Sequence, residues 1–156
     1  MKYFIGALWR DINSDDHIVR EQAETEWDKR TKLYKERYLK ERTLFPDDFI
    51  DLFESNYGFH DFKIRKIAMH MEKWSNRSCD VELSDGETVI CLVFQNISSF
   101  MVNCPSLYAG FYNELKWSYA ELGHKGKKLT LSVLCDFENE FALEFKSLSF
   151  NVNTKA

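Results

Sequence analysis

Two adjacent residues, His60 and Asp61, are the side chains in this sequence best suited to chemistry. A histidine held beside a carboxylate can act as a general base that the carboxylate orients. The pair follows Asn-Tyr-Gly at 56–58, a typical helix stop, and opens an alternating stretch typical of a strand. Because neighbours on a strand point to opposite faces, we expect Asp61 to cap the turn and His60 to pack locally. The pair is interpreted first as a structural corner and second as a functional one.

The other histidines are isolated from catalytic partners. His17 lies in a charged helical stretch and His70 on the polar face of an expected strand. His124 lies in a glycine-bounded loop with three lysines, which we interpret as a solvated hairpin end. The sequence has no phosphate-binding glycine loop, nucleophile elbow, zinc-protease motif or calcium loop. It therefore predicts no catalytic, cofactor-binding or metal-ligating residues, and a protein that is not an enzyme.

Composition narrows the class of protein further. A net charge of −4 opposes general nucleic-acid binding, which needs a positive field. No stretch approaches the ~18 apolar residues of a membrane span, and the apolar start is too short for a secretory signal. The four cysteines show neither metal-site nor redox spacing, as suits a reducing compartment. We expect a cytoplasmic protein without nucleic-acid or membrane partners and with four unpaired thiols: Cys79, Cys91, Cys104 and Cys135.

A long N-terminal helix must position part of any site. No glycine or proline interrupts the chain from Asn13 to Arg42, and Asn13 or Ser14 suits the N-cap. The expected helix has roughly 28 residues and is about 40 Å long. Its apolar residues recur at spacings of four and seven, so one face should pack inward. That face consists of Val19, Ala23, Trp27, Tyr34 and Tyr38.

Part of this helix should overhang the sheet, because strands span only about 17–20 Å. Aromatic side chains on the overhang would seek a partner. Trp27, Tyr34 and Tyr38 are therefore the expected partner surface, and a second copy of the chain, giving a homodimer, is the simplest candidate.

A short helix and a β region complete the expected fold. Pro46 suits the first position of the second helix, and Phe49, Ile50 and Phe53 form its apolar face. From Phe59 the apolar period becomes two. The prediction is one α+β domain over 1–156, mainly helical over 1–58 and antiparallel β over 59–153. Both helices should pack on a hairpin-rich sheet or sandwich.

Three details of the β region can be predicted. A slip in alternation near Arg65-Lys66 indicates a β-bulge. Asp85-Gly86 is typical of a two-residue hairpin turn. A later strand should alternate through Phe111, Leu115, Trp117 and Tyr119 on one face.

The β region also contains an internal repeat. Residues 80–98 align with 131–149 at a shift of 51 with six identities, where roughly one is expected by chance. The identities fall at strand and turn positions. The hairpin from Leu83 to Phe94 should therefore superpose on that from Leu134 to Phe145, within two repeated meanders.

The order of short motifs resembles a known family. The chain opens with Met-Lys-Tyr-Phe, and Leu44-Phe45-Pro46-Asp47-Asp48 precedes Phe59-His60-Asp61 and Phe111-Tyr112-Asn113-Glu114. This pattern resembles an uncharacterised bacterial domain-of-unknown-function family, number four-zero-eight-five in that series. Its members share the opening, a Leu-Pro segment, a Leu-His-Asp signature and a Tyr-x-Glu strand. The resemblance implies a bacterial protein but no activity.

Three functions remain open. A non-catalytic protein-interaction module is favoured by the high aromatic content, 15%, and by the missing motifs. An immunity-type protein that neutralises a bacterial toxin is a second, by analogy with similar His-Asp-bearing β domains. The third is a hydrolase-like enzyme that uses His60 and a nearby carboxylate, which a pocket around His60 would favour.

Overall fold

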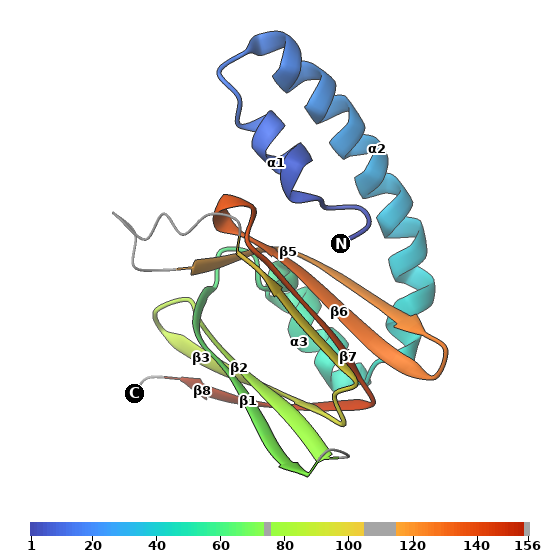
Figure 1. The fold of residues 1–156 in the computed structure, drawn as a ribbon, viewed down its shortest axis with the longest axis vertical. Helices are drawn as coiled ribbons and strands as arrows, with labels where there is room; N and C mark the ends of the chain where they lie inside the picture. The colour runs from blue at the N-terminus through green and yellow to red at the C-terminus, as the bar shows by residue number, and fades with distance from the viewer. Residues whose placement is uncertain (74–75, 105–114, 155–156) are drawn as a thin grey trace.

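The computed structural model describes residues 1–73, 76–104 and 115–154, and within them the N-terminal third is helical (Figure 1). Its helices are α1 (Gly6–Ile12), α2 (His17–Glu41) and α3 (Asp47–Ser55), with 3₁₀ turns η1 (Arg42–Leu44) and η2 (Tyr57–Phe59). The predicted long helix is confirmed, but its N-cap is Asp16, and the Asn13 or Ser14 prediction is wrong. The Asp16 carboxylate accepts from the N–H groups of Ile18 and Val19. Because a separate α1 ends at Ile12, residues 13–16 form the connection between the two helices.

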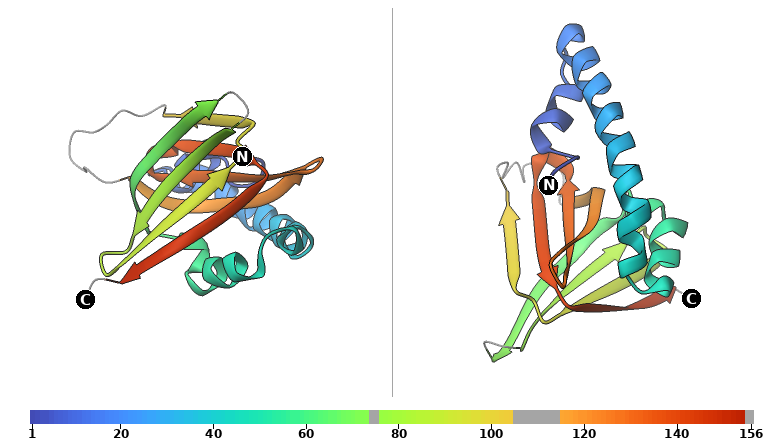
Figure 2. Two further views of the ribbon diagram at one scale, coloured as in Figure 1. Left: turned by 90° about the horizontal axis from the view of Figure 1, so that it is seen from below. Right: turned by 90° about the vertical axis from the view of Figure 1, so that its right-hand side faces the viewer.

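In the described residues, eight antiparallel strands form one sheet in the order β4-β7-β6-β5-β1-β2-β3-β8. They are β1 (Lys63–Lys73), β2 (Asn76–Ser84), β3 (Thr88–Gln95), β4 (Ser99–Asn103), β5 (Leu115–Lys125), β6 (Lys128–Cys135), β7 (Glu140–Phe145) and β8 (Ser147–Thr154). Helices packed on an antiparallel sheet confirm the predicted α+β class. The two halves of the sheet, joined between β5 and β1, contribute to one apolar core (Figure 2).

Each half of the sheet has the same topology. The meanders β1-β2-β3 and β5-β6-β7 are each followed by a strand that crosses to the other half: β4 pairs with β7, and β8 pairs with β3. The two meanders indicated by the repeat are therefore present. Their outer strands are exchanged, which ties the halves together.

The 51-residue shift holds for only one strand of the hairpin. Val81 pairs with Leu92, whereas the partner of Leu143 is Leu131, 50 residues after Val81. The turn of the second hairpin is longer by one residue, so β3 maps on β7 with a shift of 51 and β2 on β6 with a shift of 50. The predicted superposition of Leu83 on Leu134 is therefore wrong, and Leu134 faces away from the main core.

Bulges set the faces of the first strand of each meander. The predicted bulge in β1 is confirmed between Ile64 and Lys66. A second bulge lies in β5 between Trp117 and Tyr119. Trp117 therefore faces the main core, and Tyr119 faces the opposite side with α2, so the predicted alternation through both residues is wrong. Phe111 lies outside the described residues.

Helix α3 closes the main core. Phe49, Ile50 and Phe53 are buried against the strands, as predicted. Pro46 is the N-cap of α3, one position before the predicted one, because its ψ of 137° is not helical. At the β2–β3 hairpin three residues, not two, separate the strands, since Asp85 accepts hydrogen bonds from two backbone N–H groups and widens the turn.

Helix α2 packs on the outer face of β5, whereas α1 packs on α2 and on the 3₁₀ turn at Asp136–Glu138, so part of α2 projects past the sheet with α1 (Figures 1 and 2). Of the predicted inner face of α2, Ala23 is buried and the three aromatic residues are half-buried. Val19 is exposed, contrary to prediction, because it lies near the overhanging end of the helix. Among the described helices none is long and apolar enough to cross a membrane.

Candidate functional site

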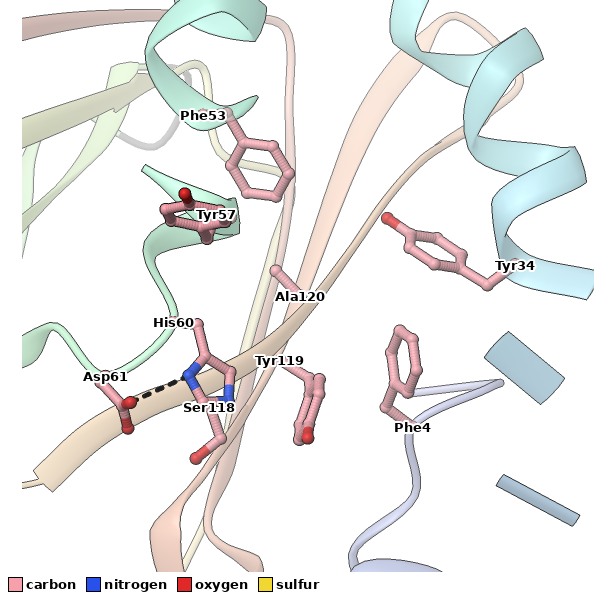
Figure 3. Close-up of a pocket in the computed structure, with 10 residues that line it drawn as sticks. Phe4, Tyr34, Phe53, Tyr57, His60, Asp61, Ser118, Tyr119 and Ala120 are labelled. Carbon is pink, nitrogen blue, oxygen red and sulfur yellow. Dashed lines mark ion pairs between the residues drawn. The ribbon is translucent and has the colours of Figure 1, made fainter. Parts of the chain in front are cut away.

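A cavity of about 650 Å³ opens beside the His60–Asp61 corner, between α2, η2 and β5 (Figure 3). Phe53 and Tyr57 lie on one side of it and Tyr34 and Phe4 on the other, with Ala120 between them. Tyr119 adds a fifth aromatic ring. The remaining lining residues are Gly58, His60, Asp61 and Ser118. A second cavity, of about 250 Å³, shares the Tyr34 and Tyr57 walls and reaches Tyr38 and Glu54.

The corner of residues 57–61 has an unusual backbone. Tyr57, Phe59 and Asp61 have φ angles of 51°, 63° and 67°, and Gly58 has 68°. Glycine adopts left-handed backbone angles without strain, whereas each other residue raises the conformational energy of the chain by about 1–2 kcal/mol. Phe59 is fully buried and anchors the corner, whereas Tyr57 is 89% exposed over the cavity. The backbone strain therefore holds an aromatic ring in water at the cavity rim.

His60 and Asp61 meet side chain to side chain, with 3.1 Å between His60 Nδ1 and Asp61 Oδ2. We expected these side chains to point apart, and that expectation is wrong because Asp61 is left-handed and β1 begins only at Lys63. The His60 ring also packs edge-on against Tyr119, at 5.2 Å between centroids. Both polar side chains are solvent-accessible, so their ion pair contributes little to stability.

Ser118 is the serine that lines the cavity, and an aliphatic hydroxyl of this kind could act as a nucleophile beside a histidine. Its hydroxyl donates to Asp136 Oδ1 at 3.0 Å, so it is engaged away from His60. In the described part of the chain, no group of three or more His, Cys, Asp or Glu side chains is placed to hold a metal ion. The cavity is thus mainly aromatic, with one polar pair at its edge.

No protein-family model, curated protein or solved structure matches this chain.

The predicted partner surface adjoins this cavity from the α2 side. Tyr34 lines it, and Tyr38 lines the neighbouring smaller one. Trp27 lies behind the wall, with ring centroids 5.2 Å from Phe4 and 4.8 Å from Tyr119. The residues that the sequence indicated separately, His60 with Asp61 and the α2 aromatics, thus converge on one region through Tyr119.

His124 lies next to the β5–β6 hairpin turn and contacts α2. His124 lies within β5, because the hairpin turn is Gly126-Lys127, and its Nδ1 is 2.5 Å from Glu41 Oε2. It is exposed at the hairpin end, as the sequence indicated, but it lies in the strand and not in the loop. Arg37 Nε donates to the other Glu41 oxygen at 3.0 Å. Burial alone would raise the pKa of Glu41, but these two hydrogen bonds outweigh it and hold that pKa below its usual value.

Sequence reasoning missed four of the five aromatic walls of the cavity: Phe4, Phe53, Tyr57 and Tyr119. Tyr57 precedes a glycine in a helix stop, and that left-handed signal could have marked it. Tyr119 carried no such signal, because an unforeseen bulge decides its face. The four cysteines all lie in the described residues and are free thiols. Burial raises the pKa of the Cys135 thiol to about 12 and that of Cys79 to about 11, so both are unreactive at neutral pH.

Proposed function

We propose that this protein is a non-catalytic binding module whose aromatic cavity receives part of a protein partner. The observation that carries the proposal is Tyr57, an aromatic ring 89% exposed and held at the cavity rim by left-handed backbone. Such strain persists where the surrounding structure imposes it, and it clusters at functional sites. Tyrosine is enriched in protein interfaces because its apolar ring carries a polar hydroxyl.

The cavity walls support the same proposal. Five aromatic side chains surround a space of about 650 Å³, within the range of ligand pockets. Aromatic anchors docked in such pockets dominate the energy of many protein interfaces. The partner would therefore insert an apolar side chain between the Tyr57 and Tyr34 walls.

We place this activity in the bacterial cytoplasm. The resemblance to a bacterial family supports the source, and the absence of redox or metal spacing among the cysteines supports a reducing compartment. An immunity-type protein would be one form of this binding module, with a toxin as its partner. A homodimer would be another form of the binding module, with a second copy of the chain as the partner.

A hydrolase-like enzyme is the second candidate, favoured by the contact between His60 and Asp61 at the cavity edge. In that role His60 would act as a base and Asp61 would orient it. The binding proposal is preferred because the Ser118 hydroxyl is committed to Asp136 and the His60–Asp61 pair is solvent-accessible.

Capture from a bacterial lysate tests the binding proposal when wild type is compared with Tyr57→Ala. A protein held by wild type should be lost from Tyr57→Ala. It should be retained by the control Leu39→Ala, which removes an exposed apolar side chain from α2. Equal capture by all three chains would contradict a role for the cavity. Hydrolysis of an ester, amide or phosphate substrate by wild type but not by His60→Ala would replace the proposal with the enzyme candidate.

A further inference from the structure

Strand β5 has a partly open edge on the side of the cavity. It pairs with β6 from Trp117 to Lys125, but β1 pairs with it only at Leu115 and Lys116. The last backbone contacts on that side join Trp117 to Asp61 and Phe62. At Asp61 the left-handed φ of 67° turns the chain away from the sheet. Within the described residues, the cavity lies where β1 would continue if it did not turn.

The pairing pattern shows which backbone groups of β5 face this open edge. Antiparallel strands alternate residues that bond to the neighbour with residues whose N–H and C=O point away from it. Lys125 and Lys128 flank a two-residue turn and form a bonded pair. Leu122 is three positions from Lys125, so its N–H and C=O point away from β6. Its N–H donates to Tyr34 Oη on that side.

Ala120 is two positions from Leu122, so its backbone groups point to the same side as those of Leu122. Its N–H and C=O therefore point away from β6, toward the cavity that Ala120 lines. The residue is 8% exposed, so these backbone groups have limited access to water. Buried main-chain donors and acceptors are nearly always paired in native proteins. Among the described residues, no hydrogen bond besides the strand ladders involves these groups, so they are complementary to another main chain.

We infer that the cavity takes an extended peptide segment of the partner, which adds a short strand to β5 by pairing with the N–H and C=O of Ala120. This inference rests on the proposed function and names the form of the partner. Strand addition supplies main-chain hydrogen bonds, while pockets for alternate side chains give specificity. A helix has no free main-chain groups except at its ends and cannot make this pairing.

The site limits the length and chemistry of the segment. Phe62 occupies the β5 edge on one side and the Tyr34 hydroxyl caps Leu122 on the other. The open stretch therefore fits one pair of main-chain hydrogen bonds at Ala120. The aromatic walls formed by Tyr57 and Tyr34 would flank an apolar side chain of the segment (Figure 3).

Amide exchange measured by NMR tests the open edge in the free protein. The Ala120 amide should exchange at least about tenfold faster than those of Tyr119 and Glu121, which bond to β6 in this pattern. Equal protection of the three amides would overturn the inference, because Ala120 would then have a partner already.

Selection of a random heptapeptide display library on the full chain tests the pairing itself. Ala120→Pro removes the outward N–H and leaves the bonds to β6, since proline is tolerated where the N–H faces away from the ladder. Selected peptides should bind Ala120→Pro about tenfold more weakly than wild type, the loss expected for one hydrogen bond. Ala120→Gly keeps the N–H and should retain binding.

If Ala120→Pro misfolds, the pairing is tested on the peptide instead. Each backbone nitrogen of a selected peptide is methylated in turn, and the affinity for the wild-type chain is measured. One methylated position should lose about tenfold in affinity for wild type. Peptides that tolerate methylation at every position, or a library that yields no binder, would overturn strand addition. If a captured partner is still lost from Tyr57→Ala in that case, the proposed binding function holds and only strand addition is wrong. If the wild-type chain forms an oligomer in the absence of peptide and Ala120→Pro dissociates it, a second copy of the chain supplies the segment, and the inference of a separate partner is wrong.

Discussion

The phenol oxygen of Tyr34 accepts a hydrogen bond of 2.9 Å from the backbone N–H of Leu122. This bond joins α2 to the edge of β5, where no further strand pairs within the described residues. Burial raises the pKa of Tyr34, so the phenol remains protonated at neutral pH. A side chain thus supplies the partner that a neighbouring strand would otherwise provide, and it marks the end of the open stretch at Ala120.

Tyr34→Phe should lower the free energy of unfolding by about 1–3 kcal/mol, because the Leu122 N–H would be buried without a partner. Urea denaturation measures the loss. Tyr38→Phe is the matched control, since the Tyr38 hydroxyl donates to the exposed Glu54 carboxylate and its removal leaves no buried group unpaired. Equal losses in the two variants would contradict a special role for the Tyr34 bond.

Tyr57→Gly should separate stability from binding. Glycine adopts the φ of 51° without strain, so we expect stability unchanged or increased by up to about 1 kcal/mol. Capture of the partner should fall, because the exposed ring at the cavity rim is lost. Thermal unfolding and lysate capture give the two readouts. A clear drop in melting temperature would show that the ring supports the fold.

Gly58→Ala should destabilise the corner more than Gly126→Ala does. Both glycines have positive φ, 68° and 63°, so both variants bear a similar backbone cost of about 1–2 kcal/mol. A Cβ on Gly58 would also lie 3.2 Å from the Phe53 ring, whereas one on Gly126 meets nothing within 4 Å. Thermal melts compare the pair. Equal shifts would mean that the Phe53 contact relaxes at no cost.

Glu41→Gln should destabilise the protein by about 1–3 kcal/mol at pH 7, since Arg37 and His124 lose a buried charged acceptor. Because the folded pKa of Glu41 lies below its unfolded value, its contribution is present above about pH 4.5 and is lost as pH falls below that. The difference between wild type and Glu41→Gln should therefore shrink below pH 4.5 in urea titrations. The control Glu26→Gln, at a more exposed carboxylate that also pairs with an arginine, should show a smaller effect throughout.

Trp27→Ala should lower the melting temperature by several degrees. Its ring packs against Phe4 and Tyr119 and holds α2 to the sheet, although it is only half-buried. We expect a loss near or below the ~3 kcal/mol lower bound for fully buried aromatics. Light scattering on both chains tests the homodimer proposal, which requires the mass to halve in the variant. An unchanged melting temperature would contradict the packing of α2.

The sequence by itself determined most local elements, although not α1. Helices α2 and α3 follow from uninterrupted apolar spacing and from the buried face of Phe49, Ile50 and Phe53. The strands follow from alternation, and the repeat predicted two meanders. These features depend on residues a few positions apart, so a local pattern is enough to specify them.

Only the tertiary structure decided the site. The bulge before Tyr119 turned that ring toward α2, and the left-handed Asp61 brought its carboxylate to His60. The Tyr34–Leu122 bond spans 88 residues and the Glu41–His124 contact spans 83. Both contacts depend on how α2 packs against β5. A one-residue shift in a strand reverses which face its side chains occupy, so local spacing alone could not place these residues around one cavity.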